Sequence, residues 1–152
     1  QDGPRIGIRY RYDTALRDYV EDMLLKRSST FVRELERLGD RFNELYLPAS
    51  RDAERWQPIL EQFDSYGKRI DKLHLSEGWK TLGRLTTEDG IVSQAYEEDK
   101  HKLGDLQRFG QLIVLMMYQP AGLYACPMAM TDGAAFTFLQ IFKEAKQANQ
   151  NV

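Results

Sequence analysis

The feature that most constrains this chain is a long stretch with almost no charge. Between Arg108 and Lys143 the only charged side chain is Asp132, although 29% of all residues are charged. Its longest apolar run, Leu112 to Tyr118, is far shorter than the ~20 residues that a membrane helix needs. A helix that is apolar on all sides must be covered on several sides. The stretch therefore predicts a central, packed part of a folded domain.

Helical spacing within this stretch predicts two helices with a break between them. Residues 102–118 are predicted to form a buried helix ended by Pro120. Residues 121–132 are predicted to be a loop or a broken helix, because Gly122 and Pro127 interrupt them. A last helix is predicted over about 133–146. The stripe of the first helix consists of Leu103, Leu106, Phe109, Leu112, Ile113, Leu115 and Met116.

Asp132 is interpreted as the N-cap of that last helix, where a carboxylate accepts helix amides and favours the positive end of the dipole. The alternatives are that Thr131 is the cap, or that its hydroxyl faces a ligand. Met128 and Met130 indicate core packing or, alternatively, the adaptable wall of an apolar pocket. Cys126 is interpreted as a small buried apolar residue.

The first half of the chain also shows helical patterns. Asp13 is a candidate N-cap for a helix to about residue 26, and Ser28 and Ser29 are candidates for the next. The segment Leu47-Pro48-Ala49-Ser50 is expected to end that second helix. Its apolar stripe is Phe31, Val32, Leu35, Leu38, Phe42 and Leu45.

Three further helices are expected between residues 51 and 96. The first spans about 51–65, although Pro58 falls within it and would kink it or shift its start. Ser76 is expected to cap a short helix, and Thr86 or Thr87 another. The side chains expected to point inward from the first of these helices are Trp56, Ile59, Leu60 and Phe63.

These patterns predict an all-α fold, an antiparallel helical array with short connections and no strand. The 152 residues suggest one domain, or a piece of a larger protein. The predicted organisation is an irregular lead-in over 1–12, a helical domain over 13–146 and a polar tail over 147–152. Because the first residue is Gln rather than Met, we interpret the chain as processed or as missing its start.

Composition excludes several functional classes. The net charge is −2, so composition provides no basic stripe for nucleic acid. One cysteine cannot form a disulfide within the chain, and two separated histidines make no metal-ligand pattern. No glycine-rich phosphate loop or nucleophile motif is present. Residues and spacing alone thus indicate a helical domain with an unusual apolar face and an undetermined function.

Three motifs in order resemble the AidB-like branch of the acyl-CoA dehydrogenase superfamily. Residues 66–72 (YGKRIDK) with Trp79 resemble its "YxxWGxRxD…W" region, and residues 95–99 (AYEED) resemble its "AWEED". Residues 124–131 (YACPMAMT) resemble "CPxxMT", and residues 132–135 match the "DGAA" of its "TDGAA" variant. The resemblance covers about 55–140 well and the first 50 residues weakly. Tyr96 departs from the family pattern, which has Trp there.

The resemblance implies the N-terminal helical domain of an FAD-dependent acyl-CoA dehydrogenase. In that family a β-domain and a C-terminal helical domain follow, FAD lies mainly against those domains, and a C-terminal glutamate is the catalytic base. No catalytic residue is therefore expected in this chain, which is interpreted as a fragment. Carried over by position, Thr131 and Met130 would contact the cofactor. The residues expected to bind substrate are Met128, Met130, Thr131, Gly133, Ala134 and Phe138.

The same resemblance implies partners and leaves alternatives open. An acyl-CoA or fatty acyl group, the remaining domains and a tetrameric assembly are expected, in an intracellular compartment that is cytoplasmic or mitochondrial. Nucleic acid is not expected to bind this domain. One alternative is a non-catalytic acyl- or nucleic-acid-binding protein of the same fold, as in alkylation-response relatives. Another is a free-standing helical module whose apolar face docks a protein.

Overall fold

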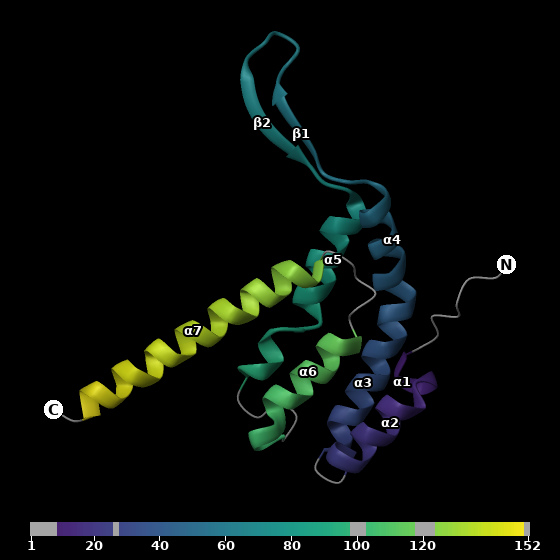
Figure 1. Ribbon diagram of the computed structural model, residues 1–152, viewed down its shortest axis with the longest axis vertical. Helices are drawn as coiled ribbons and strands as arrows, with labels where there is room; N and C mark the ends of the chain where they lie inside the picture. The colour runs from purple at the N-terminus through teal and green to yellow at the C-terminus, as the bar shows by residue number, and fades with distance from the viewer. Residues whose placement is uncertain (1–8, 26–27, 98–102, 118–123, 151–152) are drawn as a thin grey trace.

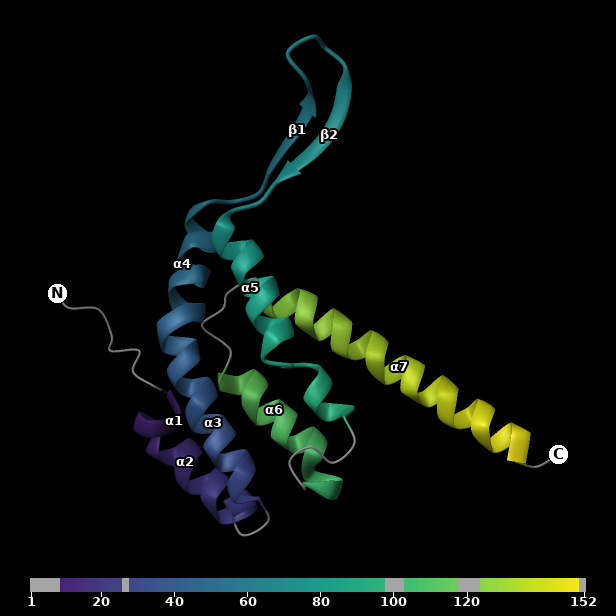
Figure 2. The same cartoon turned by 180° about the vertical axis from the view of Figure 1, so that it is seen from behind.

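The computed structural model describes residues 9–25, 28–97, 103–117 and 124–150. It is mostly helical, as predicted, but it also contains a β-hairpin that projects from one end (Figures 1 and 2). No described helix is long and apolar enough to cross a membrane. The elements are α1 (Arg9–Tyr12), α2 (Thr14–Val20), α3 (Ser29–Arg41), α4 (Leu47–Arg55), β1 (Ile59–Phe63), β2 (Arg69–His74), α5 (Glu77–Glu88), α6 (Gln107–Met117) and α7 (Ala125–Gln150).

Three of the predicted helix starts are confirmed by their capping hydrogen bonds. The Asp13 carboxylate accepts from the Leu16 amide at 2.9 Å, and the Ser28 hydroxyl accepts from the Phe31 amide at 3.1 Å. Ser76 accepts from the amide of Trp79 at 3.1 Å at the start of α5. A cap satisfies an amide that has no partner within the helix, and it depends on neighbours only three residues away. These starts could therefore be predicted from local sequence.

The predicted stop at residues 47–50 is wrong. A π-helical turn, Phe42–Tyr46, joins α3 to α4, so that the chain remains helical from Ser29 to Arg55. Pro48 lies in the first turn of α4, where a helix tolerates the missing amide. The buried face continues across the turn, since Phe42, Tyr46 and Ala49 extend the stripe of α3.

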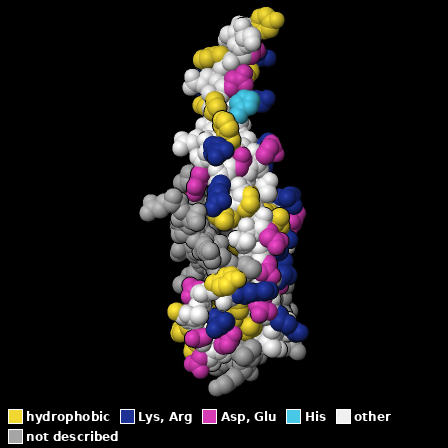
Figure 3. All heavy atoms as spheres, turned by 90° about the vertical axis from the view of Figure 1, so that its right-hand side faces the viewer, with side chains coloured by type: hydrophobic (Ala, Val, Ile, Leu, Met, Phe, Trp, Pro, Cys, Tyr) yellow, Lys and Arg dark blue, Asp and Glu magenta, His cyan; other side chains and the backbone are white. Residues whose placement is uncertain are grey.

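The predicted helix over 51–65 is wrong beyond Arg55, because β1 and β2 pair there as an antiparallel hairpin. The turn is closed by Asp64, whose carboxylate accepts from the amides of Tyr66 and Lys68 at 2.9 Å each. Gly67 has a φ of +80°, which favours glycine. Figure 3 shows hydrophobic side chains exposed along the hairpin, interleaved with charged ones. The side chains expected to point inward are thus exposed: Trp56, Ile59, Leu60 and Phe63.

The largest correction concerns the C-terminal half. The predicted loop or broken helix over 121–132 is wrong from Ala125 onward, because α7 begins there, with Pro127 in its first turn, and continues without a break. Asp132 therefore lies inside the helix, and its assignment as an N-cap is wrong. Gly122, the other predicted interruption, lies outside the described residues. Thr86 and Thr87 do not cap a helix either, because they lie within α5 and their hydroxyls donate to the Gly83 carbonyl.

Other boundaries differ by smaller amounts. Residues 9–12 form α1, and α7 extends to Gln150, so the predicted lead-in and tail are partly helical. The predicted helix over 102–118 is found as α6 over Gln107–Met117, preceded by the 3₁₀ turn Gly104–Leu106. Residues 102 and 118 and the predicted stop at Pro120 lie outside the described residues, and Leu112 of the predicted buried stripe is 47% exposed. Another 3₁₀ turn, Ser93–Ala95, follows α5. The core lies among α3, α5, α6 and the π-helical turn Glu21–Leu25 that follows α2. It is centred on Leu24, Phe31, Leu35, Leu38, Leu82, Leu85, Ile91, Ile113 and Val114.

Candidate functional site: an apolar cleft along α7

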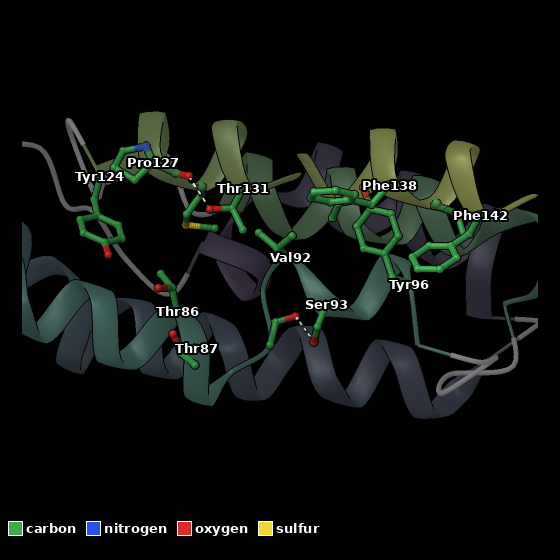
Figure 4. A pocket seen from close by; sticks show the side chains of 14 residues that line it. Thr86, Thr87, Val92, Ser93, Tyr96, Tyr124, Pro127, Thr131, Phe138 and Phe142 are labelled. Atoms are coloured by element: carbon green, nitrogen blue, oxygen red, sulfur yellow. Dashed lines mark hydrogen bonds between the residues drawn. The ribbon is translucent and has the colours of Figure 1, made fainter. Parts of the chain in front are cut away.

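A cleft of about 590 Å³ lies between α7 and the segment from the end of α5 to Tyr96 (Figure 4). One wall is a stripe of α7, and the other is the chain that carries the 3₁₀ turn Ser93–Ala95. The volume falls within the roughly 300–1,000 Å³ of small-molecule sites. The lining residues are Thr86, Thr87, Gly90, Val92, Ser93, Tyr96, Tyr124, Pro127, Met128, Thr131, Ala135, Phe138, Leu139 and Phe142.

No charged side chain is among these lining residues, and several of their hydroxyls bind backbone carbonyls. Thr131 donates to the Pro127 carbonyl at 2.8 Å, one turn back along α7. Thr86 and Thr87 donate to the Gly83 carbonyl at 3.0 and 2.9 Å. A hydroxyl whose hydrogen is already bonded to a carbonyl does not need a hydrogen-bond acceptor on a ligand. The cleft therefore presents a mainly apolar surface.

The structure divides the six predicted substrate residues between two faces of α7. Met128, Thr131 and Phe138 line the cleft, and Met128 is only 4% exposed. Successive helical residues are rotated by about 100°, so positions 128, 131, 135, 138 and 142 share one face. Met130, Gly133 and Ala134 are exposed and do not line the cleft. Met130 is 70% exposed. We call the face that carries these three residues the outer face of α7.

Asp132 connects α7 to the rest of the domain. The Arg108 guanidinium donates from Nη1 to Oδ1 at 2.6 Å and from Nη2 to Oδ2. Gln111 Nε2 donates to Oδ1 at 3.0 Å, and the Tyr96 hydroxyl donates to the same oxygen at 2.8 Å. Arg108 and Gln111 belong to α6, whereas Tyr96 follows the 3₁₀ turn. Asp132 therefore joins three segments that are distant in sequence.

The electrostatics of this cluster favour the ionised carboxylate. Hydrogen bonds from Arg108, followed by those from Gln111 and Tyr96, lower the pKa of Asp132 to about 2, against the opposing effect of burial. Burial, together with the hydrogen bond to Asp132, raises the pKa of Tyr96, so its hydroxyl remains a donor. The guanidinium carbon of Arg108 lies 5.7 Å from the ring centre of Tyr96 and 6.0 Å from that of Phe136. Both distances suit cation–π contact.

Sequence reasoning missed Arg108, Gln111 and the opposite wall of the cleft. A signal was present for Arg108, because it is the last charge before the apolar stretch and Asp132 is the only charge within it. Two opposite charges that border one apolar segment are good candidates for a pair, since an unpaired buried charge is costly. No comparable signal marked Thr86, Val92 or Ser93.

Cys126 is exposed, which corrects the expectation of a buried residue. It lies at the edge of a second hollow of about 560 Å³ beside Trp79 and Pro127. The Trp79 ring packs edge-on against Tyr124, with centroids 4.9 Å apart. Within the described residues, no group of three His, Cys, Asp or Glu side chains could hold a metal ion.

The structure is thus a mostly helical domain with a small hairpin and an apolar cleft. A family model described as "Adaptive response protein AidB N-terminal domain" matches residues 8–151. The chain belongs to this family. The resemblance inferred from the three motifs is thereby confirmed, and the chain is an N-terminal domain of the acyl-CoA dehydrogenase family.

Individual relatives agree with this assignment. The chain is 35% identical over 161 residues to acyl-CoA dehydrogenase family member 11 of Caenorhabditis elegans, covering 100% of this chain and 25% of that protein. The crystal structure of Caenorhabditis elegans ACDH-11 in complex with C11-CoA matches with a TM-score of 0.83 and 34% identity, covering 92% of this chain and 24% of that one. The apo-form of Bd2924 matches with a TM-score of 0.78 and 36% identity, covering 89% and 27%. The chain thus spans about a quarter of the length of these relatives.

Proposed function

We propose that this domain forms one wall of an acyl-chain pocket in an acyl-CoA dehydrogenase-like protein. The observation that carries the proposal is the cleft along α7, whose lining residues include no charged side chain. Each CH₂ group of an acyl chain gains ~0.8 kcal/mol when it leaves water for an apolar site. A charge on that wall would cost several kcal/mol unless it were paired. The side chains proposed to contact the acyl chain include Met128, Thr131 and Phe138.

A relative supports the choice of ligand. ACDH-11, which is 34% identical to this chain, is described in complex with C11-CoA. We therefore take a saturated acyl-CoA of about that length as the first ligand to test. The acyl chain would occupy the cleft, and its thioester would lie in a part of the protein outside the described residues. In this arrangement the domain binds and orients the chain and excludes water from it.

The outer face of α7 is proposed to contact FAD or the domain that holds it. Met130 on this face offers an exposed thioether. Thr131 lies on the cleft face instead, where its oxygen retains lone pairs while its hydrogen is bonded to the Pro127 carbonyl, and it is proposed to reach the cofactor from that side. These groups fit a contact with the flat ring of the flavin rather than with its pyrophosphate, which requires donors or positive charge. When bound, FAD supplies the capacity to accept a hydride from the acyl chain. The residues of this chain would hold the acyl chain in position for that step.

The acyl pocket is tested with two charge substitutions on the same helix. Phe138 and Met130 are both exposed, at 63% and 70%, but only Phe138 lines the cleft. Phe138→Lys should weaken binding of undecanoyl-CoA to the intact protein at least tenfold by isothermal titration calorimetry, because a cation would face the chain. Met130→Lys, compared at full flavin occupancy because Met130 is proposed to face the cofactor, should leave that affinity within about threefold of wild type. Equal affinities for wild type and Phe138→Lys would refute the pocket assignment.

Catalysis is distinguished from binding alone by the flavin spectrum of the intact protein. A dehydrogenase shows bleaching of the bound flavin near its visible maximum when undecanoyl-CoA is added without oxygen. A protein that binds the acyl chain but does not oxidise it keeps the oxidised spectrum after saturation. The second result would favour the alternative of an acyl-binding protein of the same fold.

A further inference from the structure

The Asp132 cluster lies where α7 meets the rest of the domain. Among the α7 residues whose side chains are described, only Met128 is buried, so the helix has little apolar anchorage of its own. The Asp132 carboxylate accepts hydrogen bonds from α6 and from Tyr96, which follows the 3₁₀ turn Ser93–Ala95. Its side chain is only 13% exposed. The attachment of α7 to the domain therefore depends on this carboxylate to an unusual degree.

The geometry of the cluster fixes rotation as well as distance. A guanidinium that donates two bonds to one carboxylate holds both groups in a common orientation, unlike a single contact. Asp132 is rotated about 40° around the helix axis from Met128, away from Thr131 and Phe138. Turning α7 about its axis would break the paired bonds and bring the outer face towards the cleft.

Tyr96 belongs to both the cluster and the cleft. Its hydroxyl shares its one hydrogen between the carboxylate and the main-chain carbonyl of Asp132, at 2.8 and 2.9 Å, while its ring lines the cleft near Phe138 and Phe142 (Figure 4). The Arg108 guanidinium packs over that ring. Tyr96 therefore links the wall of the cleft to the carboxylate of Asp132.

We propose that Asp132 is a positioning residue that, through Arg108 and Tyr96, sets the rotation of α7 and so determines which of its side chains form the wall of the cleft. The proposal deepens the proposed function and rests on it for the identity of the ligand. It assigns a role to the one charge in the apolar stretch, away from the acyl chain itself.

Amide hydrogen exchange of the intact protein tests, without any ligand, whether Asp132 holds α7 in place. Asp132→Asn preserves the shape of the side chain but removes the charge that pairs with Arg108. Exchange in peptides covering residues 128–140 should become at least about tenfold faster. The matched control is Asp52→Asn, because the Asp52 carboxylate accepts from the Gly78 amide at 2.7 Å in the contact between α4 and α5, away from the cleft. Unchanged exchange in α7 of Asp132→Asn, or the same increase in the control, overturns the proposal.

Affinity for undecanoyl-CoA and octanoyl-CoA tests the consequence for the wall. Asp132→Asn should weaken undecanoyl-CoA binding about tenfold and Tyr96→Phe about threefold, and the ratio of the two affinities should change. A variant that was merely less stable would leave this ratio as it is in wild type, and that result overturns the positioning role. The two proposals can fail separately. Absence of binding by the wild type refutes the acyl pocket, whereas the exchange measurement still decides whether Asp132 holds α7.

Discussion

The surroundings of Asp132 strongly influence its ionisation. Its hydrogen bonds with Arg108, and then those with Gln111 and Tyr96, lower its pKa to about 2 in the folded protein. The ordinary value for the group is 3.8. A lowered pKa means that the folded state binds the proton more weakly than the unfolded chain does. The stabilisation is therefore fully present above pH 4 and is lost as the pH falls towards 2.

We predict that Asp132→Asn reduces the free energy of unfolding by roughly 2 kcal/mol at pH 7. At pH 3 the difference from wild type should be about 1 kcal/mol smaller, because the wild-type carboxylate is then partly protonated in the unfolded state. Urea denaturation of both proteins at the two pH values measures the difference. A difference that stayed constant or grew between pH 7 and pH 3 would contradict the assigned pKa.

The sequence showed that Asp132 is exceptional, because it is the only charge in the apolar stretch, but it did not reveal which residues it contacts. A carboxylate before Gly-Ala-Ala fits a helix start, and nothing local reveals that α7 has already begun at Ala125. Its actual partners, Arg108, Gln111 and Tyr96, are 21 to 36 residues away. Helix caps at Asp13, Ser28 and Ser76 could be predicted because their partners are three residues away.

At the scale of elements, the hairpin shows where periodicity fails. Ile59, Leu60 and Phe63 have a spacing that suits a helix, but Pro58 precedes them and Gly67 allows a tight turn that pairs β1 with β2. Apolar residues in a short run cannot by themselves distinguish a strand from a helix. An isolated two-stranded hairpin is marginal in water, so its apolar side chains mark a surface rather than a core.

Two equal substitutions test this distinction between surface and core. Leu35 is fully buried in α3, whereas Leu60 on β1 is 52% exposed. Leu35→Ala should reduce the free energy of unfolding by about 2–5 kcal/mol, because it leaves a cavity in the core. Leu60→Ala should change it by less than about 0.5 kcal/mol. Thermal or urea unfolding measures both, and a large loss for Leu60→Ala would show that the hairpin belongs to the folding core.

The outer face of α7 yields a second prediction at this scale. Gly133 lies inside the helix, yet a Cβ built there meets no described atom within 4 Å. Gly133→Ala should therefore stabilise α7 by up to about 1 kcal/mol and slow its amide exchange. If FAD or its domain packs closely on this face, the same variant of the intact protein should bind FAD more weakly in a flavin-release fluorescence assay. Lys143→Ala, further along α7, serves as the control, and equal flavin affinity for both variants would refute the contact.

At the scale of the whole molecule, the cleft is formed by two segments that are distant from each other in the sequence. Residues 86–96 and 124–142 line it from opposite sides. Three local motifs were enough to identify the family, since each is read from adjacent residues. The opposite wall could not be predicted, because it depends on how α5 and α7 pack. Likewise, the division of Met128 and Met130 between two faces follows from an unbroken α7, whereas Pro127 predicted a break in this segment.

The central claim is that an acyl chain lies in this cleft, and photo-crosslinking tests it most directly. The intact protein would be labelled with an undecanoyl-CoA analogue that carries a diazirine at the far end of its chain, and the modified peptides would be mapped by mass spectrometry. The account predicts labels within residues 86–96 and 124–142, suppressed by excess undecanoyl-CoA. Saturable labelling confined to other parts of the protein would contradict it.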